Sequence, residues 1–389
     1  MKDSTKVYLY TGGWCLYFLQ GVFGMKGSYV AVVLSILLVA ISFLYVFLSQ
    51  PVSEVRKGKI PYLLVALDLF FLVLLISKVA YVIGQGEITK LEFKDLQVLC
   101  ITLLPVYFYY YYSKKGCLKE KEMRCVAVLF LTFLFVNYLY FYMDRMAIIG
   151  SDEFTNNAGR FLVSIVPMLM LFDEKNRLQI VLGLLISFLV MLSAKREALL
   201  VLLIEILLIF VWKTKDSSVK QKVKTYLVLL LVLFALAYLS YYMFENISYF
   251  QKRIYETLYG NLSGRDRLLP RLLYEFLYNS TDPQFLFGRG TLKTWTLVGN
   301  FAHNDLMELA TCQGIVGIVF YLNLWLALVC FWKRQEKGIL KLASLMLLVD
   351  FFCGAEFSRF YFSTYVPLFA MLGFILGKQK NAERRATHE

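Results

Sequence analysis

Long apolar runs recur along this chain and alternate with short polar connections. Many of them approach the length of about 20 residues that a helix needs to cross the hydrocarbon core of a bilayer. Within lipid, every backbone polar group must be bonded inside its own segment, which favours helices, and the alternating pattern of a membrane barrel is absent from the sequence. We therefore predict an all-α polytopic membrane protein with about twelve spans, at residues 6–24, 28–49, 60–84, 96–112, 124–143, 159–172, 178–194, 197–212, 225–244, 312–332, 340–354 and 360–377.

These spans divide the chain into four parts. We expect nine transmembrane helices in 1–244, a long hydrophilic segment at 245–311, three more helices in 312–377 and a tail at 378–389. Because the first apolar stretch lacks a small-residue cleavage site and another span follows at once, we interpret it as the first span and not as a cleavable signal peptide.

The lysines and arginines of the connections predict the orientation of the spans. Cytoplasmic connections carry an excess of these residues near span ends. Basic connections alternate here with sparse ones, which places both termini in the cytoplasm and the segment 245–311 on the extracytoplasmic side. The basic connections contain Arg56, Lys57 and Lys59; Lys114, Lys115, Lys119, Lys121 and Arg124; Lys213, Lys215, Lys220, Lys222 and Lys224; Lys333, Arg334, Lys337 and Lys341; and the tail residues Lys378, Lys380, Arg384 and Arg385.

Composition agrees with this picture and narrows the chemistry. Apolar residues make up 59% of the chain and charged residues 18%. The net charge of +13 follows largely from the basic connections, which suit anionic membrane lipids, so it calls for no nucleic-acid partner. The seven cysteines show no paired CxxC spacing, and one usable histidine is too few for a transition-metal site. We therefore expect no metal and no cofactor.

The segment 245–311 contains the most informative polar residues. Leucines and Phe276 recur at helical spacing over 266–279, which predicts an amphipathic helix lying on the membrane surface. Apart from a histidine in the last two residues, His303 is the only histidine of the chain, at the point where a polar loop runs into an apolar helix. One such histidine, taken alone, is more often a loop residue of no consequence.

Two groups of cations lie on the predicted outer side, although an excess of lysine and arginine is expected on the cytoplasmic side. The very short turn between the seventh and eighth spans carries Lys195 and Arg196, and the segment 245–311 carries Arg265 and Arg267 among other basic residues. A single cation at a span end usually extends toward the membrane surface and only ends its helix. Two cations in one tight turn are less readily explained in this way.

Several short motifs follow one another in a characteristic order. They are Ser263-Gly264-Arg265, then Pro283 with Gly288-Arg-Gly290, then His303-Asn304-Asp305, and then Gly314-Ile-Val-Gly317. Over Ser263 to Phe320, this order and spacing resembles the O-antigen polymerase and O-antigen ligase superfamily of bacterial membrane glycosyltransferases. Ser193-Ala-Lys-Arg196 resembles the arginine element of that family at an outer span junction. The chain departs from the family where a tryptophan often follows the Gly-Arg element, since Leu268, Leu269 and Pro270 stand there instead.

The resemblance implies a glycosyltransferase C-like fold and a specific reaction in the bacterial inner membrane. A glycan passes from undecaprenyl diphosphate to an acceptor hydroxyl on the outer face, without a nucleotide sugar or a metal. Polymerases use a lipid-linked repeat unit as acceptor and build O-antigen or capsule, whereas ligases use the lipid-A core of lipopolysaccharide or another terminal acceptor. A chain-length regulator and a flippase are candidate protein partners.

The residues present suit that chemistry. An acceptor alcohol is a weak nucleophile, and a histidine with an unperturbed pKa of about 6.5 can accept its proton, so His303 is the candidate general base. A diphosphate leaving group gains negative charge that planar guanidinium groups bind in pairs of hydrogen bonds, which makes Arg196 and Arg265 the candidate diphosphate ligands. The candidates for supporting roles are Asn304, Asp305 and Glu308, beside His303, and the cations Lys195 and Arg267.

We expect a polymerase ahead of a ligase, and the sequence also leaves a transporter open. Its only support is the number of spans and the charges inside them, which are costly in lipid unless paired or hydrated. These charges are Asp68, Lys78, Glu205 and Asp350, and we interpret them as interhelical partners in preference to a proton path. A lipid-linked glycan flippase would be the transporter of this class.

Overall fold

The computed structural model describes residues 2–22, 28–51, 54, 60–85, 90–146, 158–172, 177–193, 195–215, 217–246, 248–259, 265–357 and 366–386. These residues form helices and no strand, which confirms the all-α prediction. Within this part of the chain, five helices are long and apolar enough to cross a membrane, so the chain has the character of a multi-pass membrane protein. They are α2 (Tyr29–Ser49), α4 (Tyr62–Gln85), α7 (Glu120–Met146), α12 (Val219–Asn246) and α17 (Asp305–Arg334).

Shorter or less apolar helices occupy the other predicted ranges. Two of these ranges contain a broken helix, because Pro105 begins α6 after α5 and Pro167 lies in the first turn of α9 after α8. The shorter helices are α1 (Asp3–Phe18) with η1 (Leu19–Gly21), α5 (Lys90–Leu103), α6 (Pro105–Lys114), α8 (Ala158–Val163), α9 (Val166–Leu169), α10 (Arg177–Leu192), α11 (Arg196–Lys215), α18 (Ile339–Phe357) and α19 (Val366–Ala386).

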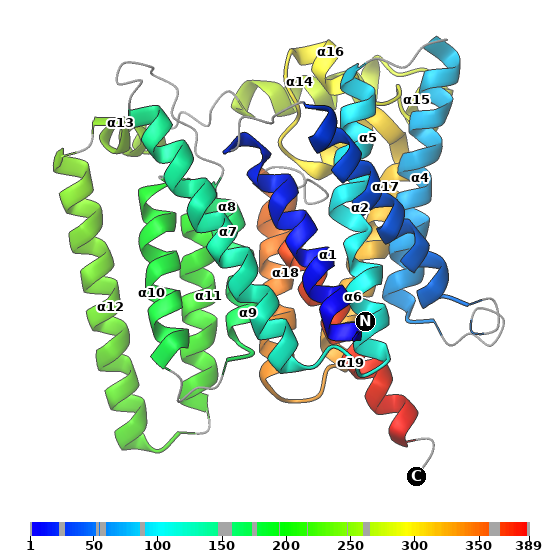
Figure 1. Ribbon diagram of the computed structural model, residues 1–389. Helices are drawn as coiled ribbons and strands as arrows, with labels where there is room; N and C mark the ends of the chain where they lie inside the picture. The colour runs from blue at the N-terminus through cyan, green and yellow to red at the C-terminus, as the bar shows by residue number, and fades with distance from the viewer. Residues whose placement is uncertain are drawn as a thin grey trace.

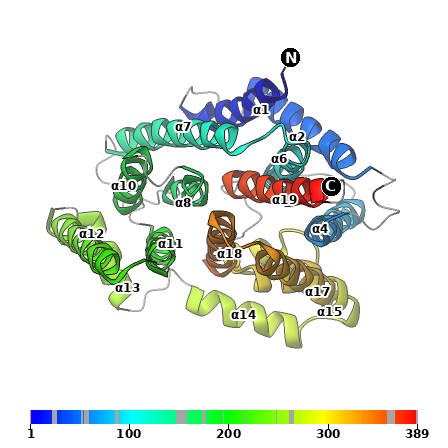
Figure 2. The same cartoon turned by 90° about the horizontal axis from the view of Figure 1, so that it is seen from below.

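The helices form a bundle whose centre is the pair α6 and α19 (Figure 2). Glycines allow these two helices to approach closely, because a Cβ atom built on Gly373 would lie 2.3 Å from the Val106 carbonyl oxygen. Helix α12 lies at the periphery of the bundle (Figure 2). Only 6% of the residues in its most apolar stretch are buried, so most of its apolar surface faces outward.

Four helices lie at one end of the bundle, while both termini lie toward the other end (Figure 1). These helices are α13 (Ser248–Leu258), α14 (Arg265–Tyr278), α15 (Asp282–Phe287) and α16 (Lys293–Val298). Helix α14 matches the predicted amphipathic helix, and it buries Leu272 and Phe276 while Phe276 stacks on Phe285 at a ring distance of 4.9 Å. We refer to this end as the α13–α16 end.

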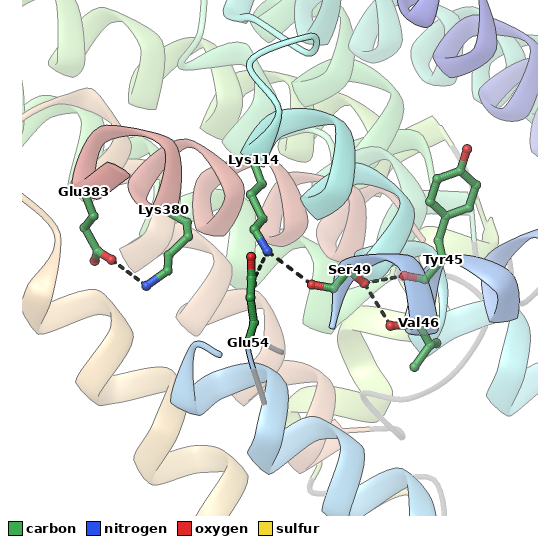
Figure 3. A network of polar contacts seen from close by, with 7 residues as sticks. All are labelled: Tyr45, Val46, Ser49, Glu54, Lys114, Lys380 and Glu383. Carbon is green, nitrogen blue, oxygen red and sulfur yellow. Dashed lines mark hydrogen bonds and ion pairs between the residues drawn. The ribbon is translucent and has the colours of Figure 1, made fainter. Parts of the chain in front are cut away.

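Ion pairs fasten the opposite end of the bundle. The buried Lys114 donates to the Ser49 carbonyl oxygen at 3.3 Å and pairs with Glu54, so a cation lies at the C-terminal end of α2 (Figure 3). The expected tail at 378–389 begins as helix, since α19 continues to Ala386.

Candidate functional site

Helix α17 is folded back on itself at Gly314. Gly314 has φ 66° and ψ −158°, which is not helical and which side-chain-bearing residues rarely adopt. The Tyr321 hydroxyl donates to Asp305 Oδ2 at 2.7 Å, although 16 residues separate them. In a straight helix that separation spans about 24 Å. The segment 305–313 therefore lies back against the segment 315–334.

The turn at Gly314 is built against the preceding loop. The amides of Arg289 and Gly290 donate to the carbonyl oxygens of Thr311 and Cys312, at 2.9 and 3.1 Å, and so satisfy groups that the interrupted helix leaves unbonded. A Cβ atom built on Gly314 would lie 2.6 Å from the Gly288 amide nitrogen. The structure thus brings together two of the motifs that carry the family resemblance, Gly288-Arg-Gly290 and Gly314-Ile-Val-Gly317.

The fold-back also sets the depth of the loop that carries His303. Gln313 Nε2 donates to Ser77 Oγ at 3.3 Å, and the Tyr321 ring lies 5.6 Å from the Phe70 ring. Ser77 and Phe70 are two turns apart on α4, a rise of about 10 Å. Asp305, bonded to Tyr321, consequently lies deeper in the bundle than Gly314.

The predicted supporting residue Glu308 organises this loop. Its side chain is buried, Oε1 accepts from Thr294 Oγ1 at 2.7 Å and Oε2 accepts from the Ala302 amide at 2.9 Å. It therefore fixes the backbone immediately before His303. His303 itself is partly buried and has φ 52°, a left-handed conformation that histidine adopts more readily than most residues. Asp305 is fully buried and bonds Tyr321, so it too acts on the shape of the loop.

Asn304 joins this loop to α18. Its Oδ1 accepts from the Met307 amide at 3.1 Å and caps α17, while its Nδ2 donates to Glu356 Oε2 at 3.2 Å. Glu356 was not among the predicted site residues. It is a carboxylate on the predicted outer side between the last two spans, which is the signal that could have identified it.

A buried cluster of charges contacts the same end of α18. Arg160 Nε pairs with Glu197 Oε1 at 2.6 Å, and Lys195 Nζ lies 3.1 Å from the same oxygen. Arg160 Nη2 donates to the Cys353 carbonyl oxygen at 3.5 Å. Arg196 lies between Lys195 and Glu197 and begins α11. The turn predicted to hold the diphosphate is thus fastened to α18 one helical turn from Glu356.

Arg160 and Glu197 were also not among the predicted site residues. Arg160 is a cation at the predicted outer end of a span, which is the same signal that singled out Lys195 and Arg196. Glu197 follows Arg196 directly, and opposite charge makes a carboxylate beside two cations a candidate partner for them.

The arginines of the hydrophilic segment have different surroundings. Arg265 is the first residue of α14, but its side chain, with Ser263 and Gly264, lies outside the described residues. Arg267 is exposed on α14. Arg289 donates to the Glu275 carboxylate at 3.1 Å, to the Glu275 carbonyl oxygen at 2.7 Å and to Ser280 Oγ at 3.4 Å, so it holds the loop between α14 and α15.

The charges predicted to lie inside spans have polar partners or neighbours. Asp68 accepts from Gln50 Nε2 at 2.8 Å and from the Tyr107 hydroxyl, and Lys78 pairs with Asp95. Beside the Lys78–Asp95 pair, a small pocket of about 20 Å³ reaches Glu308 and Gln313.

Two further charged residues of the predicted spans are both carboxyls and lie near each other. Glu205 on α11 and Asp350 on α18 are buried close to one another. They lie on the same helices as Arg196 and Glu356.

His303 supplies a partly buried imidazole, and next to it in the chain the Asn304 amide contacts the Glu356 carboxylate. The turn of Lys195 and Arg196 supplies cations at the same end of α18. Such a set can bind an anionic group and accept a proton. Comparison of the sequence with protein-family models and with curated proteins gives no match.

Proposed function

We propose that this protein is a metal-independent membrane glycosyltransferase that polymerises lipid-linked repeat units of a surface polysaccharide. The observation that carries the proposal is the fold-back at Gly314. It places the loop of His303 so that Asn304 bonds Glu356, at the end of α18 where the turn of Lys195 and Arg196 is also fastened. A base and cations near one another at a membrane surface are what transfer from a polyprenyl diphosphate requires.

The reaction can be written with these residues in defined roles. The acceptor hydroxyl oxygen attacks the anomeric carbon of the growing glycan, and a new glycosidic bond forms while the bond from that carbon to the diphosphate oxygen breaks. His303 takes the hydroxyl proton, and undecaprenyl diphosphate leaves with the bonding electron pair. Arg196 and Arg265 bind the diphosphate oxygens as their charge grows.

Glu308, Asn304 and Asp305 position the loop and do not react. Glu308 fixes the backbone before His303, Asn304 caps the helix after it, and Asp305 holds the fold-back. Lys195 and Arg267 supply further positive charge near the donor. No step passes through a metal ion, since the cations carry the charge of the leaving group.

The proposal includes a topology. Twelve crossings place both termini in the cytoplasm and the α13–α16 end outside the bacterial inner membrane. The position of both termini toward the opposite end from α13–α16 supports this orientation (Figure 1). The donor and acceptor lipids would then be reached from the outer leaflet.

A ligase that transfers the finished glycan to a lipid-A core uses the same groups and is the nearest alternative. A transporter is the alternative of another class, and the buried carboxyl pair Glu205 and Asp350 is the observation that favours it. In a transporter, removal of that pair would abolish function while loss of His303 would not.

The test is a comparison of surface glycan from wild type, a deletion strain and an Arg196→Lys strain on gels, with protein abundance in the membrane measured. A polymerase gives only single-repeat product when it is deleted, whereas a ligase leaves long glycan on the carrier. Arg196→Lys keeps the charge but loses the paired hydrogen bonds, so we expect shortened ladders. A full ladder in the deletion strain would overturn the proposal.

A further inference from the structure

A groove opens near the C-terminal end of the chain, far from the loop of His303. It has a volume of about 370 Å³ and is lined by residues of the start of α4, the end of α17 and the last turns of α19. These three helices lie near one another in Figure 2. Leu63, Phe331 and Leu376 supply apolar walls, and Arg334 and Lys380 supply two cations. Glu383 also lines the groove, so the three charged residues sum to one net positive charge. A groove with apolar walls and a net positive rim fits an amphiphile with a negative head.

One row of side chains on α17 leads from the apolar surface into this groove. Leu322, Leu326, Cys330 and Arg334 follow one another at intervals of four residues and so share a helix face. Leu322 is 53% exposed and Leu326 57% exposed, while Cys330 and Arg334 line the groove. The row thus changes from exposed apolar residues to a cation at the helix end.

The charges at the rim leave positive groups available to a ligand. Lys380 Nζ lies 2.8 Å from Glu383 Oε2 (Figure 3), but an ammonium has three donors and the Lys380 side chain is partly exposed. Arg334 is exposed in the last turn of α17. Tyr62 donates to Asn323 Oδ1 at 2.5 Å and ties α4 to α17 at the exposed side of the groove.

We propose that this groove binds one anionic phospholipid. Its phosphate contacts Arg334 and Lys380, and an acyl chain lies along Leu326 and Leu322. The lipid bridges α4, α17 and α19 and stabilises their packing. This inference is independent of glycosyl transfer, because none of these residues belongs to the site of His303.

The experiment measures lipid retained by the detergent-purified full-length protein, by native mass spectrometry, after exchange into micelles containing phosphatidylglycerol or phosphatidylcholine. We expect wild type to retain phosphatidylglycerol and Arg334→Gln to retain about fivefold less, as expected for the loss of one cation from a headgroup site. Lys337→Gln removes an exposed lysine outside the groove and should retain lipid like wild type.

Three results would overturn the inference. They are equal retention of the two lipids, retention by Arg334→Gln that equals wild type, and binding of glycerol 3-phosphate as tight as that of the whole lipid, which would indicate a site for a soluble phosphate. Lys380→Gln provides a second variant, and thermal unfolding without added lipid checks that each variant is folded. If Arg334→Gln is unfolded, retention by Lys380→Gln decides.

Discussion

The Tyr321 hydroxyl bonds Asp305 Oδ2 at 2.7 Å, across a helix that would hold the two residues far apart if it were straight. This contact closes a hairpin of two helical segments around Gly314. Irregular backbone within a membrane bundle is tolerated where protein surrounds it, and here Asp305 and Glu308 are both buried. The hairpin places the loop of His303 next to α18, where Asn304 bonds Glu356.

Tyr321→Phe removes the hydroxyl and leaves the ring in place. We expect a loss of about 2 kcal/mol in unfolding free energy, because a buried carboxyl loses a hydrogen-bond donor. Unfolding in mild detergent measures it. Tyr238→Phe, on the exposed face of α12, is the matched control and should change nothing. Equal stability of Tyr321→Phe and wild type would show that this hydrogen bond does not stabilise the fold-back.

Gly314→Ala places a Cβ atom where the chain has positive φ and where Gly288 and Leu286 lie within 2.6 Å. We expect a cost of about 3 kcal/mol or more, with loss of the glycan ladder. In contrast, Gly183→Ala adds a Cβ atom that meets nothing within 4 Å inside α10, so it should be neutral or slightly stabilising. Similar stabilities for the two variants would show that the turn is not held as described.

Arg160→Met removes one member of a buried ion pair and leaves Glu197 paired with Lys195. We expect destabilisation of about 3 kcal/mol, because an incompletely compensated charge stays buried. The double variant Arg160→Met with Glu197→Leu should recover part of that loss. Additive losses in the double variant, measured by thermal unfolding, would show that the two residues do not interact.

A cysteine in α16 reports which side of the membrane carries the α13–α16 end. Thr294 is fully buried, whereas Thr296 is exposed and accessible to a thiol reagent. We replace the exposed Cys125 by serine. We then expect a maleimide that cannot cross the inner membrane to label Thr296→Cys in cells whose outer membrane has been permeabilised. Labelling only after the cytoplasmic membrane is opened would invert the topology and exclude the proposed reaction.

The lengths of the apolar runs predicted much of the fold, because lipid requires each apolar segment to satisfy its own backbone. Every predicted range contains helical residues, and the amphipathic pattern at 266–279 became α14. Hydropathy did not predict the break at Pro105, since apolar residues continue on both sides of it.

The site was less predictable, for a physical reason. Gly314 lies within an apolar run that continues across it, so hydropathy cannot distinguish a fold-back from a straight helix. The bonds of Glu308 to Thr294 and Ala302, and of Asn304 to Glu356, depend on this turn. The residue types of the site were visible in the sequence, but their pairing was not.

The most direct test of the account replaces His303 by asparagine, which tolerates the left-handed backbone at this position but has no imidazole. The measurement is the surface glycan ladder of cells carrying His303→Asn or the nearby control Thr296→Ala, with membrane abundance checked for both. We predict only single-repeat glycan with His303→Asn and a full ladder with Thr296→Ala. A full ladder from His303→Asn would contradict the assignment of His303 as the catalytic base.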